Sequence, residues 1–287
     1  MHTFTIQPIG PFQLTTSARF LCGFTPGAGT SCVNDDALTL GFLADETYEP
    51  TVVRLRQRDG IEGESTKKNV SEQVARMLSL DHDATPLQTI AKKDKVVRGL
   101  LRRTPGFRPV CFPSPYEAAV WGVLAQRVRM SVASSIKREL AIETGSVVEG
   151  FGRTFFPSPR PKKLLGVKSF RGVSSEKMER LHGVARAALD GHFDVRRLRQ
   201  MTKEQALEHL QQLHGIGKWT AGHILLRGTG ISDELPGMEP RVLAGVAKAY
   251  GVERPDLETI SEGWRPLRMW VSVLIVMNHW TSPPRKS

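Results

Sequence analysis

Residues 213–221 hold the most informative chemistry in the chain, because their glycines and polar side chains could bind an anion. The segment reads Leu-His-Gly-Ile-Gly-Lys-Trp-Thr-Ala and lies between two stretches with helical periodicity. Gly215 and Gly217 permit a tight turn and leave the first amides of the next helix uncovered. Such helix N-termini bind phosphate, and Lys218 and Thr220 would add a positive charge and a hydroxyl group. A glycine cap between two packed helices is the alternative interpretation.

The net charge of the chain favours a polyanionic partner for such a site. The formal charge is +11, with residues 1–50 at −4, residues 151–200 at +8 and residues 201–250 neutral. Nucleic acid and an anionic membrane are the partners that fit this balance, although a basic protein without either would fit as well. The longest apolar run, Trp270–Met277, is far shorter than the roughly 20 residues of a membrane span. We therefore expect nucleic acid as the partner and no membrane.

The three cysteines exclude several kinds of site. Cys22, Cys32 and Cys111 have neither CxxC nor Cys/His spacing, so they predict no disulfide framework and no zinc site. Three scattered thiols are also too few for the four thiolates of an iron–sulfur cluster. The N-terminus lacks the pattern of a signal peptide. We expect a reducing interior, with the protein in the cytoplasm and associated with the nucleoid if the source is bacterial.

The hydrophobic pattern changes its period along the chain. The first sixty residues indicate strands, with alternation in residues 51–60 before an Asp59-Gly60 turn. Residues 60–70 are polar and indicate an exposed turn, and residues 144–173, rich in Gly, Pro and basic residues, indicate an irregular segment. From Ser71 onward the spacing favours helices, which we expect over 71–80, 86–102, 114–126, 130–143, 174–190, 202–213, 218–227, 240–250 and 264–280.

These elements predict the α+β class, with a β-rich N-terminal domain followed by an all-helical domain. The hydrophobic fraction of 40% is enough for a buried core. Pro and Gly cluster in residues 105–113, which favours a boundary there. We expect the domains to span residues 1–105 and 106–287, although the helices within 71–102 could pack with either domain.

Four stretches resemble one family. LHGIGKWTAGHILLRG (213–228) resembles the helix–hairpin–helix of the HhH-GPD DNA glycosylases, within them the 3-methyladenine DNA glycosylase II (AlkA) branch. PSPYEAAVWGVLAQRV (113–128), GWRPLRMW (263–270) and IGPFQLTTSARFLCGFTPG (9–27) resemble other parts of that branch. The resemblance implies a TBP-like N-terminal domain, a helical HhH-GPD domain and a monomer. It also implies double-stranded DNA with damaged bases as the partner.

The resemblance assigns the catalytic carboxylate to Glu239. The family has a D-x-φ-P-x-x-D pattern ending in its catalytic Asp, and residues 233–239 here read Asp-Glu-Leu-Pro-Gly-Met-Glu. Glu239 retains the charge but extends it by one methylene, or about 1.5 Å, and misplacement of about 1 Å can cost on the order of 10²-fold in rate. Glu239 also fits a first-turn acid on a helix that begins at Pro240. Two functions remain open: a monofunctional glycosylase of alkylated purines, or a catalytically weak or inactive damage-recognition protein.

The resemblance also suggests residues for the base pocket and the wedge. Trp219 matches a pocket tryptophan, and because the lyase members have lysine there, we expect no lyase activity. His223 could stack on a base, hydrogen-bond to it, or simply pack between helices. Phe20 matches an N-terminal pocket aromatic. Arg127 matches the residue that fills the gap left by a flipped base, or it contacts phosphate.

Only one ion is implied as a cofactor. By resemblance, the hairpin carbonyls of His214 and Ile216 bind a monovalent cation that bridges to phosphate, and we expect no other cofactor. Trp264, Trp270 and Val276 are expected to pack in the core.

Overall fold

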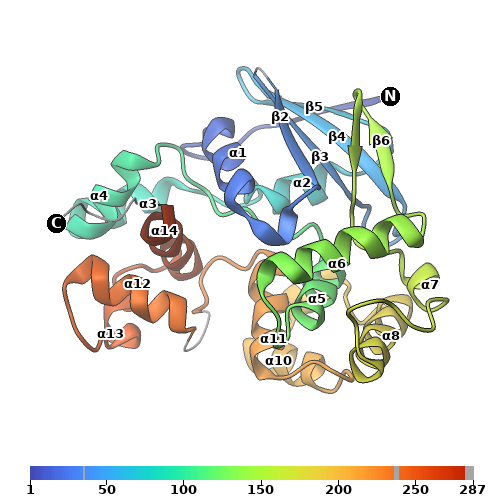
Figure 1. Ribbon diagram of the computed structural model, residues 1–287. Helices are drawn as coiled ribbons and strands as arrows, with labels where there is room; N and C mark the ends of the chain where they lie inside the picture. Colours follow the sequence, from blue (N-terminus) through green and yellow to red (C-terminus); the bar gives the residue numbers. More distant parts are fainter. Residues whose placement is uncertain (35, 236–238, 282–287) are drawn as a thin grey trace.

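The computed structural model describes residues 1–34, 36–235 and 239–281. Its N-terminal part is a five-stranded antiparallel sheet in the order β1-β5-β4-β3-β2 (Figure 1). The strands are β1 (His2–Ile6), β2 (Ser31–Asn34), β3 (Ala37–Leu43), β4 (Pro50–Gln57) and β5 (Ile61–Ser65).

Two expectations for the first seventy residues are wrong. Leu14–Gly23 is a helix, α1, because its apolar residues Leu14, Ala18 and Leu21 recur at helical spacing and pack against the sheet. The polar segment after Gly60 is not an exposed turn but strand β5, in which Ile61, Gly63 and Ser65 are buried and pair with β4.

The rest of the described chain is mostly helical. The helices are α2 (Ser71–Met77), α3 (Thr85–Lys93), α4 (Lys95–Arg103), α5 (Pro115–Leu124), α6 (Met130–Glu143), α7 (Pro161–Leu164), α8 (Ser175–Leu189), α9 (Val195–Gln200), α10 (Lys203–Gln211), α11 (Lys218–His223), α12 (Pro240–Tyr250), α13 (Leu257–Glu262) and α14 (Arg268–Thr281). Thr25–Gly27 forms a 3₁₀ turn, and Ile224–Gly228 continues α11 as a π-helical turn. Among the described residues, no helix is long and apolar enough to cross a membrane.

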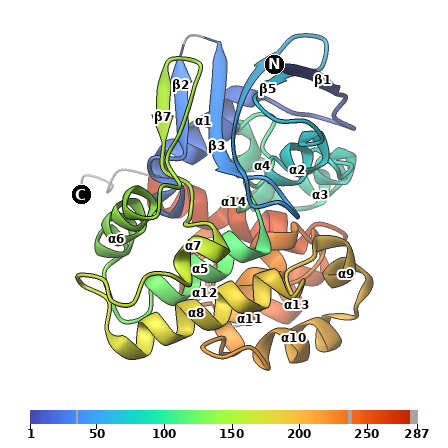
Figure 2. The ribbon, with the colours of Figure 1, turned by 90° about the vertical axis from the view of Figure 1, so that its right-hand side faces the viewer.

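The segment 144–173 is more ordered than its composition predicts, and it joins the sheet to the helices. It contains a hairpin of β6 (Val148–Gly150) and β7 (Arg153–Phe155). Strand β6 lies beside β4 (Figure 1), and β7 contacts β3 on the same side of the molecule (Figure 2). Phe155 is buried against Gly41 of β3, where an added Cβ would lie 2.2 Å from the Phe155 Cβ. The hairpin therefore depends on a glycine in the neighbouring strand.

Three apolar clusters form the core. One lies under the sheet, a second joins α5, α6, α8, α10 and α11, and a third joins α3 and α4 to α12 and α14. Trp264 and Trp270 are fully buried in the third cluster and Val276 packs against it, which confirms the packing role expected for them. Helices α3 and α4 thus share their core with the C-terminal helices.

Candidate active site

The hairpin between α10 and α11 has the tight turn that its glycines predict. Gly215 has φ +86°, and an added Cβ would lie 2.6 Å from the Arg180 side chain, so both backbone strain and a close neighbour require glycine. Gly217 is the residue before α11, and Lys218 is the first residue of that helix; both are exposed. The start of α11 is therefore open to solvent with a lysine beside it.

Thr220 does not contribute to this surface, and the expectation that it contacts phosphate is wrong. Its side chain is only 4% exposed and packs against Gly122 of α5, where an added Cβ would lie 2.6 Å from the Thr220 Cγ2. The Ile216 side chain is likewise in the core, whereas His214 is exposed. Within the described ranges, no group of three or more His, Cys, Asp or Glu side chains could hold a metal ion.

Trp219 begins a row of aromatic rings that crosses from the hairpin to the N-terminal domain. Its ring is half exposed and stacks on His223, with centroids 5.1 Å apart and planes 9° apart. His223 meets Phe112 edge-on at 5.1 Å. Phe112 meets Phe24 at 5.4 Å, and Phe24 lies 5.5 Å from Phe20. We call these five rings the aromatic row; its open end is Trp219, and Phe20 is at the opposite end.

Sequence reasoning missed Phe112 and Phe24, the third and fourth rings of this row. Phe24 lies in the segment that resembles the family's N-terminal domain, four residues after Phe20, which is one helical turn in an α-helix. That spacing was a usable signal. Phe112 sits in the Pro-rich connection before α5, where no periodicity indicates its neighbours.

His223 is electrically neutral in this setting. Burial, together with the nearby Arg227 guanidinium, lowers the pKa of His223 to about 3. The His223 Nε2 atom is buried and has no hydrogen-bond partner among the described residues. Arg227 lies in the π-helical turn, donates from Nη2 to the Val110 carbonyl, and has its guanidinium 5.6 Å from the Phe24 ring. The Trp219 ring thus stacks on a neutral ring, and a partly buried cation lies beyond it.

Glu239 faces Trp219 rather than the helix that it precedes. It occupies the N-cap position of α12 with extended backbone, but its carboxylate makes no capping hydrogen bond in the described structure. Instead, the Trp219 Nε1–H donates to Glu239 Oε2 at 3.2 Å. The residues Pro236, Gly237 and Met238 of the same motif lie outside the described residues. The carboxylate and the open indole ring therefore form one site.

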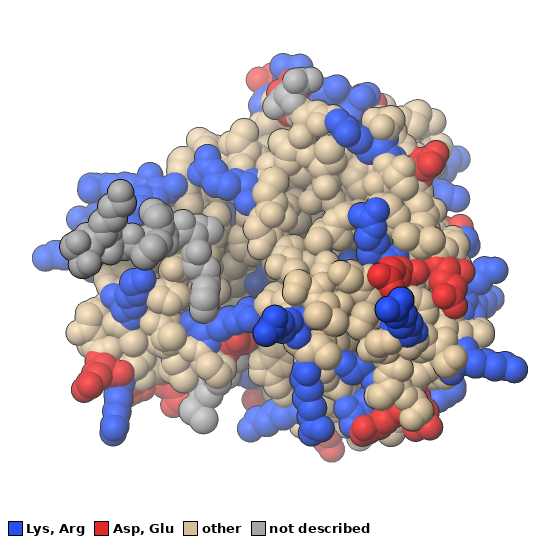
Figure 3. Space-filling view, viewed as in Figure 1, with Lys and Arg blue, Asp and Glu red and all other residues tan. Residues whose placement is uncertain are grey.

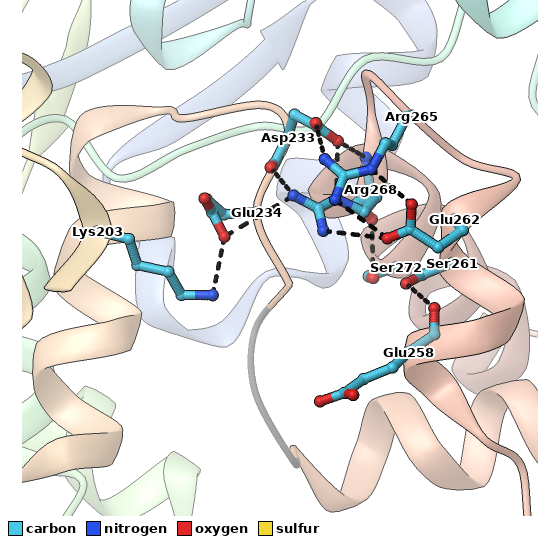
Figure 4. A network of polar contacts seen from close by, with 9 residues as sticks. All are labelled: Lys203, Asp233, Glu234, Glu258, Ser261, Glu262, Arg265, Arg268 and Ser272. Atoms are coloured by element: carbon cyan, nitrogen blue, oxygen red, sulfur yellow. Dashed lines mark hydrogen bonds and ion pairs between the residues drawn. The ribbon is translucent and has the colours of Figure 1, made fainter.

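The loop that leads to Glu239 is tied to two helices by ion pairs (Figure 4). Asp233 accepts hydrogen bonds from Arg268 Nε at 2.9 Å and from Arg265 Nη1 at 3.0 Å, at the start of α14. Glu234 accepts from Lys203 Nζ of α10 at 2.8 Å. Asp233 and Glu234 are thus engaged in holding the loop, whereas the Glu239 carboxylate lies at the aromatic row.

Known proteins resemble this chain in both sequence and fold. No family model matches it. A DNA-3-methyladenine glycosylase of Bacillus subtilis (strain 168) is 28% identical over 215 residues, which cover 72% of this chain and 70% of the relative. DNA-3-methyladenine glycosylase 2 of Escherichia coli (strain K12) is 28% identical over 194 residues, covering 60% and 68%. The solved 3-methyladenine DNA-glycosylase from Archaeoglobus fulgidus has a TM-score of 0.76 at 21% identity, covering 98% of this chain and 99% of that chain.

The chain is thus similar in sequence to DNA-3-methyladenine glycosylases of two bacteria and shares its fold with a solved one. Because the solved 3-methyladenine glycosylase matches nearly the whole chain, its fold includes both the N-terminal sheet and the helical body. This confirms the α+β class and the helix–hairpin–helix glycosylase fold that the sequence resembles.

Within this glycosylase fold, Arg127 lies on the loop 125–129 between α5 and α6. It is exposed and has φ +55°, a left-handed conformation that is uncommon for a residue other than glycine. The preceding residue, Gln126, donates from Nε2 to the Gly215 carbonyl oxygen at 3.3 Å, so this loop lies beside the hairpin.

Proposed function

We propose that the chain is a monofunctional DNA glycosylase that removes alkylated purines from duplex DNA in base excision repair, with Glu239 as its catalytic carboxylate. The observation that carries the proposal is the Trp219–Glu239 hydrogen bond of 3.2 Å. It places a carboxylate beside a half-exposed indole ring, in a chain related to DNA-3-methyladenine glycosylases. A base stacked on that ring would bring its sugar toward the carboxylate.

The reaction needs little beyond a well-placed negative charge. In a 3-methyladenine nucleotide the bond between C1′ and N9 breaks, and its electron pair moves to the cationic base, which leaves as the neutral purine. The sugar becomes an oxocarbenium-like cation, and Glu239 stabilises it electrostatically. Water then bonds to C1′ and loses a proton to the carboxylate or to solvent. No general acid is required for this leaving group.

The aromatic row suits a flipped purine. A cationic base on the open Trp219 face would gain about 0.5–2 kcal/mol of cation–π attraction. Neutral His223 behind the indole adds no repulsive charge at physiological pH, because its pKa is about 3. Partly buried Arg227 contributes a positive charge beyond His223, so neutral lesions such as hypoxanthine belong in any substrate panel as well.

Base release from DNA decides between this proposal and a damage-binding protein without chemistry. The assay would present 3-methyladenine, 7-methylguanine, hypoxanthine and ethenoadenine in duplex DNA, with undamaged duplex as the control. We expect release of at least one alkylated purine, and binding without release of any base would favour the damage-recognition alternative. We also expect that borohydride traps no covalent protein–DNA complex, because by resemblance Trp219 stands where lyase members have the lysine that forms a Schiff base with the sugar.

Lys218 and the amides at the start of α11 are proposed to hold a DNA phosphate. Lys218→Ala should weaken binding to damaged and undamaged duplex alike and reduce the slope of log affinity against log salt by about one unit. Fluorescence anisotropy across a salt series measures the slope. An unchanged slope would contradict the contact.

The carbonyls of His214 and Ile216 are proposed to bind a monovalent cation next to that phosphate. If they do, replacing K⁺ with a large organic cation at constant ionic strength should weaken binding. Equal affinities in the two salts would contradict the cation site.

A further inference from the structure

Two basic side chains of α8 hold the loop that carries Arg127. Lys177 Nζ donates to the carbonyl oxygens of Leu124 at 3.1 Å and of Gln126 at 2.9 Å. Arg180 Nη1 donates to the Gln126 side-chain oxygen at 2.7 Å. Helices α5 and α8 pack against each other, so these contacts fix the loop to a rigid element.

The same glutamine reaches the hairpin. Its Nε2 donates to the Gly215 carbonyl oxygen at 3.3 Å. The Arg180 side chain also lies against Gly215, at the place where a Cβ would be 2.6 Å away. Loop 125–129, helix α8 and the hairpin therefore meet at one point, which we call the latch: Gln126, Lys177, Arg180 and Gly215.

The latch acts on the backbone next to Arg127. Lys177 binds the carbonyl of Gln126, which belongs to the peptide bond just before Arg127, and Arg127 has φ +55°. A left-handed conformation is unfavourable for a residue with a Cβ, so it persists only where neighbouring contacts impose it. Without the latch, this loop is expected to relax and Arg127 to change direction.

We propose that Gln126, Lys177 and Arg180 are positioning residues that couple the hairpin's hold on the DNA backbone to the insertion of Arg127 into the base stack. This inference rests on the proposed function. A wedge opens a base pair only if it is rigid relative to the point where the protein grips the duplex. The latch supplies that rigidity because it links the loop to the hairpin through one side chain.

The test compares one lesion in two contexts, using the full chain. The first substrate pairs the lesion with a normal base, and the second places it opposite an abasic-site analogue, where little work is needed to flip it. Lys177→Met and Gln126→Leu should slow base release from the paired substrate at least about tenfold, and from the unpaired substrate by no more than about threefold. Lys177→Arg, which retains a charged donor, should recover most of the loss.

Arg186→Met is the matched control. Arg186 is an exposed residue of the same helix, more than two turns beyond Lys177, so the variant loses the same charge without touching the latch. It should slow release from the two substrates equally. Equal losses on both substrates in Lys177→Met as well would overturn the inference, because a merely structural defect does not depend on pairing.

A second measurement separates this inference from the proposed function. With the Glu239→Gln protein at saturating concentration, the fluorescence of a 2-aminopurine placed next to the lesion should increase on binding. Adding Lys177→Met should reduce this increase at least about twofold. An undiminished gain would overturn the latch. If the wild-type protein releases no base but Lys177→Met still reduces the fluorescence increase, the proposed chemistry is contradicted and the latch is supported.

Discussion

At the residue scale, the site depends on the hydrogen-bond partner of Glu239 and on the protonation state of His223. Glu239 could have capped α12, but its carboxylate accepts from Trp219 instead. His223 could have been a proton donor, but burial and Arg227 keep it neutral, and its ring stacks on the indole ring of Trp219. Both features suit chemistry that depends on one carboxylate beside the indole ring.

The neutral His223 predicts a pH dependence of stability. Its pKa is about 3 in the folded protein and about 6.5 in an unfolded chain, so between these values the unfolded state binds a proton that the folded state does not. The contribution to stability is complete above pH 6.5 and is lost as the pH falls toward 3. Urea midpoints at pH 7 and pH 5 should therefore differ more for the wild type than for His223→Phe.

The exposed His214 supplies the control for this prediction. His214→Gln should retain the wild-type difference between the two pH values. If His223→Phe retained it too, His223 would not be the group responsible.

At the element scale, the sequence predicted the helices well wherever the apolar spacing was local. Helix α12 begins at Pro240 and α6 at Met130, as expected. Helix α1 was missed although Leu14, Ala18 and Leu21 have helical spacing, because the Thr and Ser residues between them are weak helix formers. The β6–β7 hairpin was missed because it packs on Gly41, which lies in a strand distant in sequence. For the site, the hairpin, Trp219 and Glu239 followed from motif resemblance.

Two other features of the site could not be predicted in this way. The burial of Thr220 and the central position of Phe112 both depend on packing between elements distant in sequence. Local patterns contain no information on such contacts, so only the folded structure reveals them.

The position of the loop before Glu239 should depend on the ion pair between Arg268 and Asp233. The Arg268 side chain is only 12% exposed, and it bonds to Asp233, so Arg268→Met leaves a partly buried carboxylate without its main partner. We expect a loss of about 1–3 kcal/mol in the free energy of unfolding and at least a tenfold slower base release. Urea denaturation and single-turnover kinetics measure the two effects.

Arg265→Met provides the comparison. Arg265 also contacts Asp233 but is half exposed, so its removal should cost less in both measurements. Equal kinetic effects of the two variants would contradict a special role for Arg268.

At the scale of the whole molecule, Lys and Arg exceed Asp and Glu, whereas the segment that carries the site is balanced in charge. Lys and Arg outnumber Asp and Glu on the face seen in Figure 3, while the segment 201–250 with the hairpin and Glu239 is neutral. A distribution of this kind suits long-range attraction of DNA by the surface and local grip by backbone amides and Lys218. The aromatic row and the β6–β7 hairpin join the N-terminal sheet to the helices that carry the site.

Gly41→Ala tests the junction between these parts. The added methyl group would lie 2.2 Å from the Phe155 Cβ, so the β6–β7 hairpin must shift. We expect a loss of about 1–3 kcal/mol in the free energy of unfolding. Gly99→Ala in α4 meets nothing within 4 Å and should leave stability equal or slightly higher, as urea denaturation would report. A stable Gly41→Ala protein would contradict this packing.

The most direct test of the account is the single-turnover rate of base release by Glu239 variants on one alkylated duplex. Glu239→Gln retains the shape of the side chain but removes its charge, so the rate should fall by about 10²–10³-fold while DNA affinity stays within about threefold. Glu239→Asp retains the charge and should retain more of the rate than Glu239→Gln. A Glu239→Gln protein that releases the base within twofold of the wild-type rate would contradict the claim that this carboxylate does the chemistry.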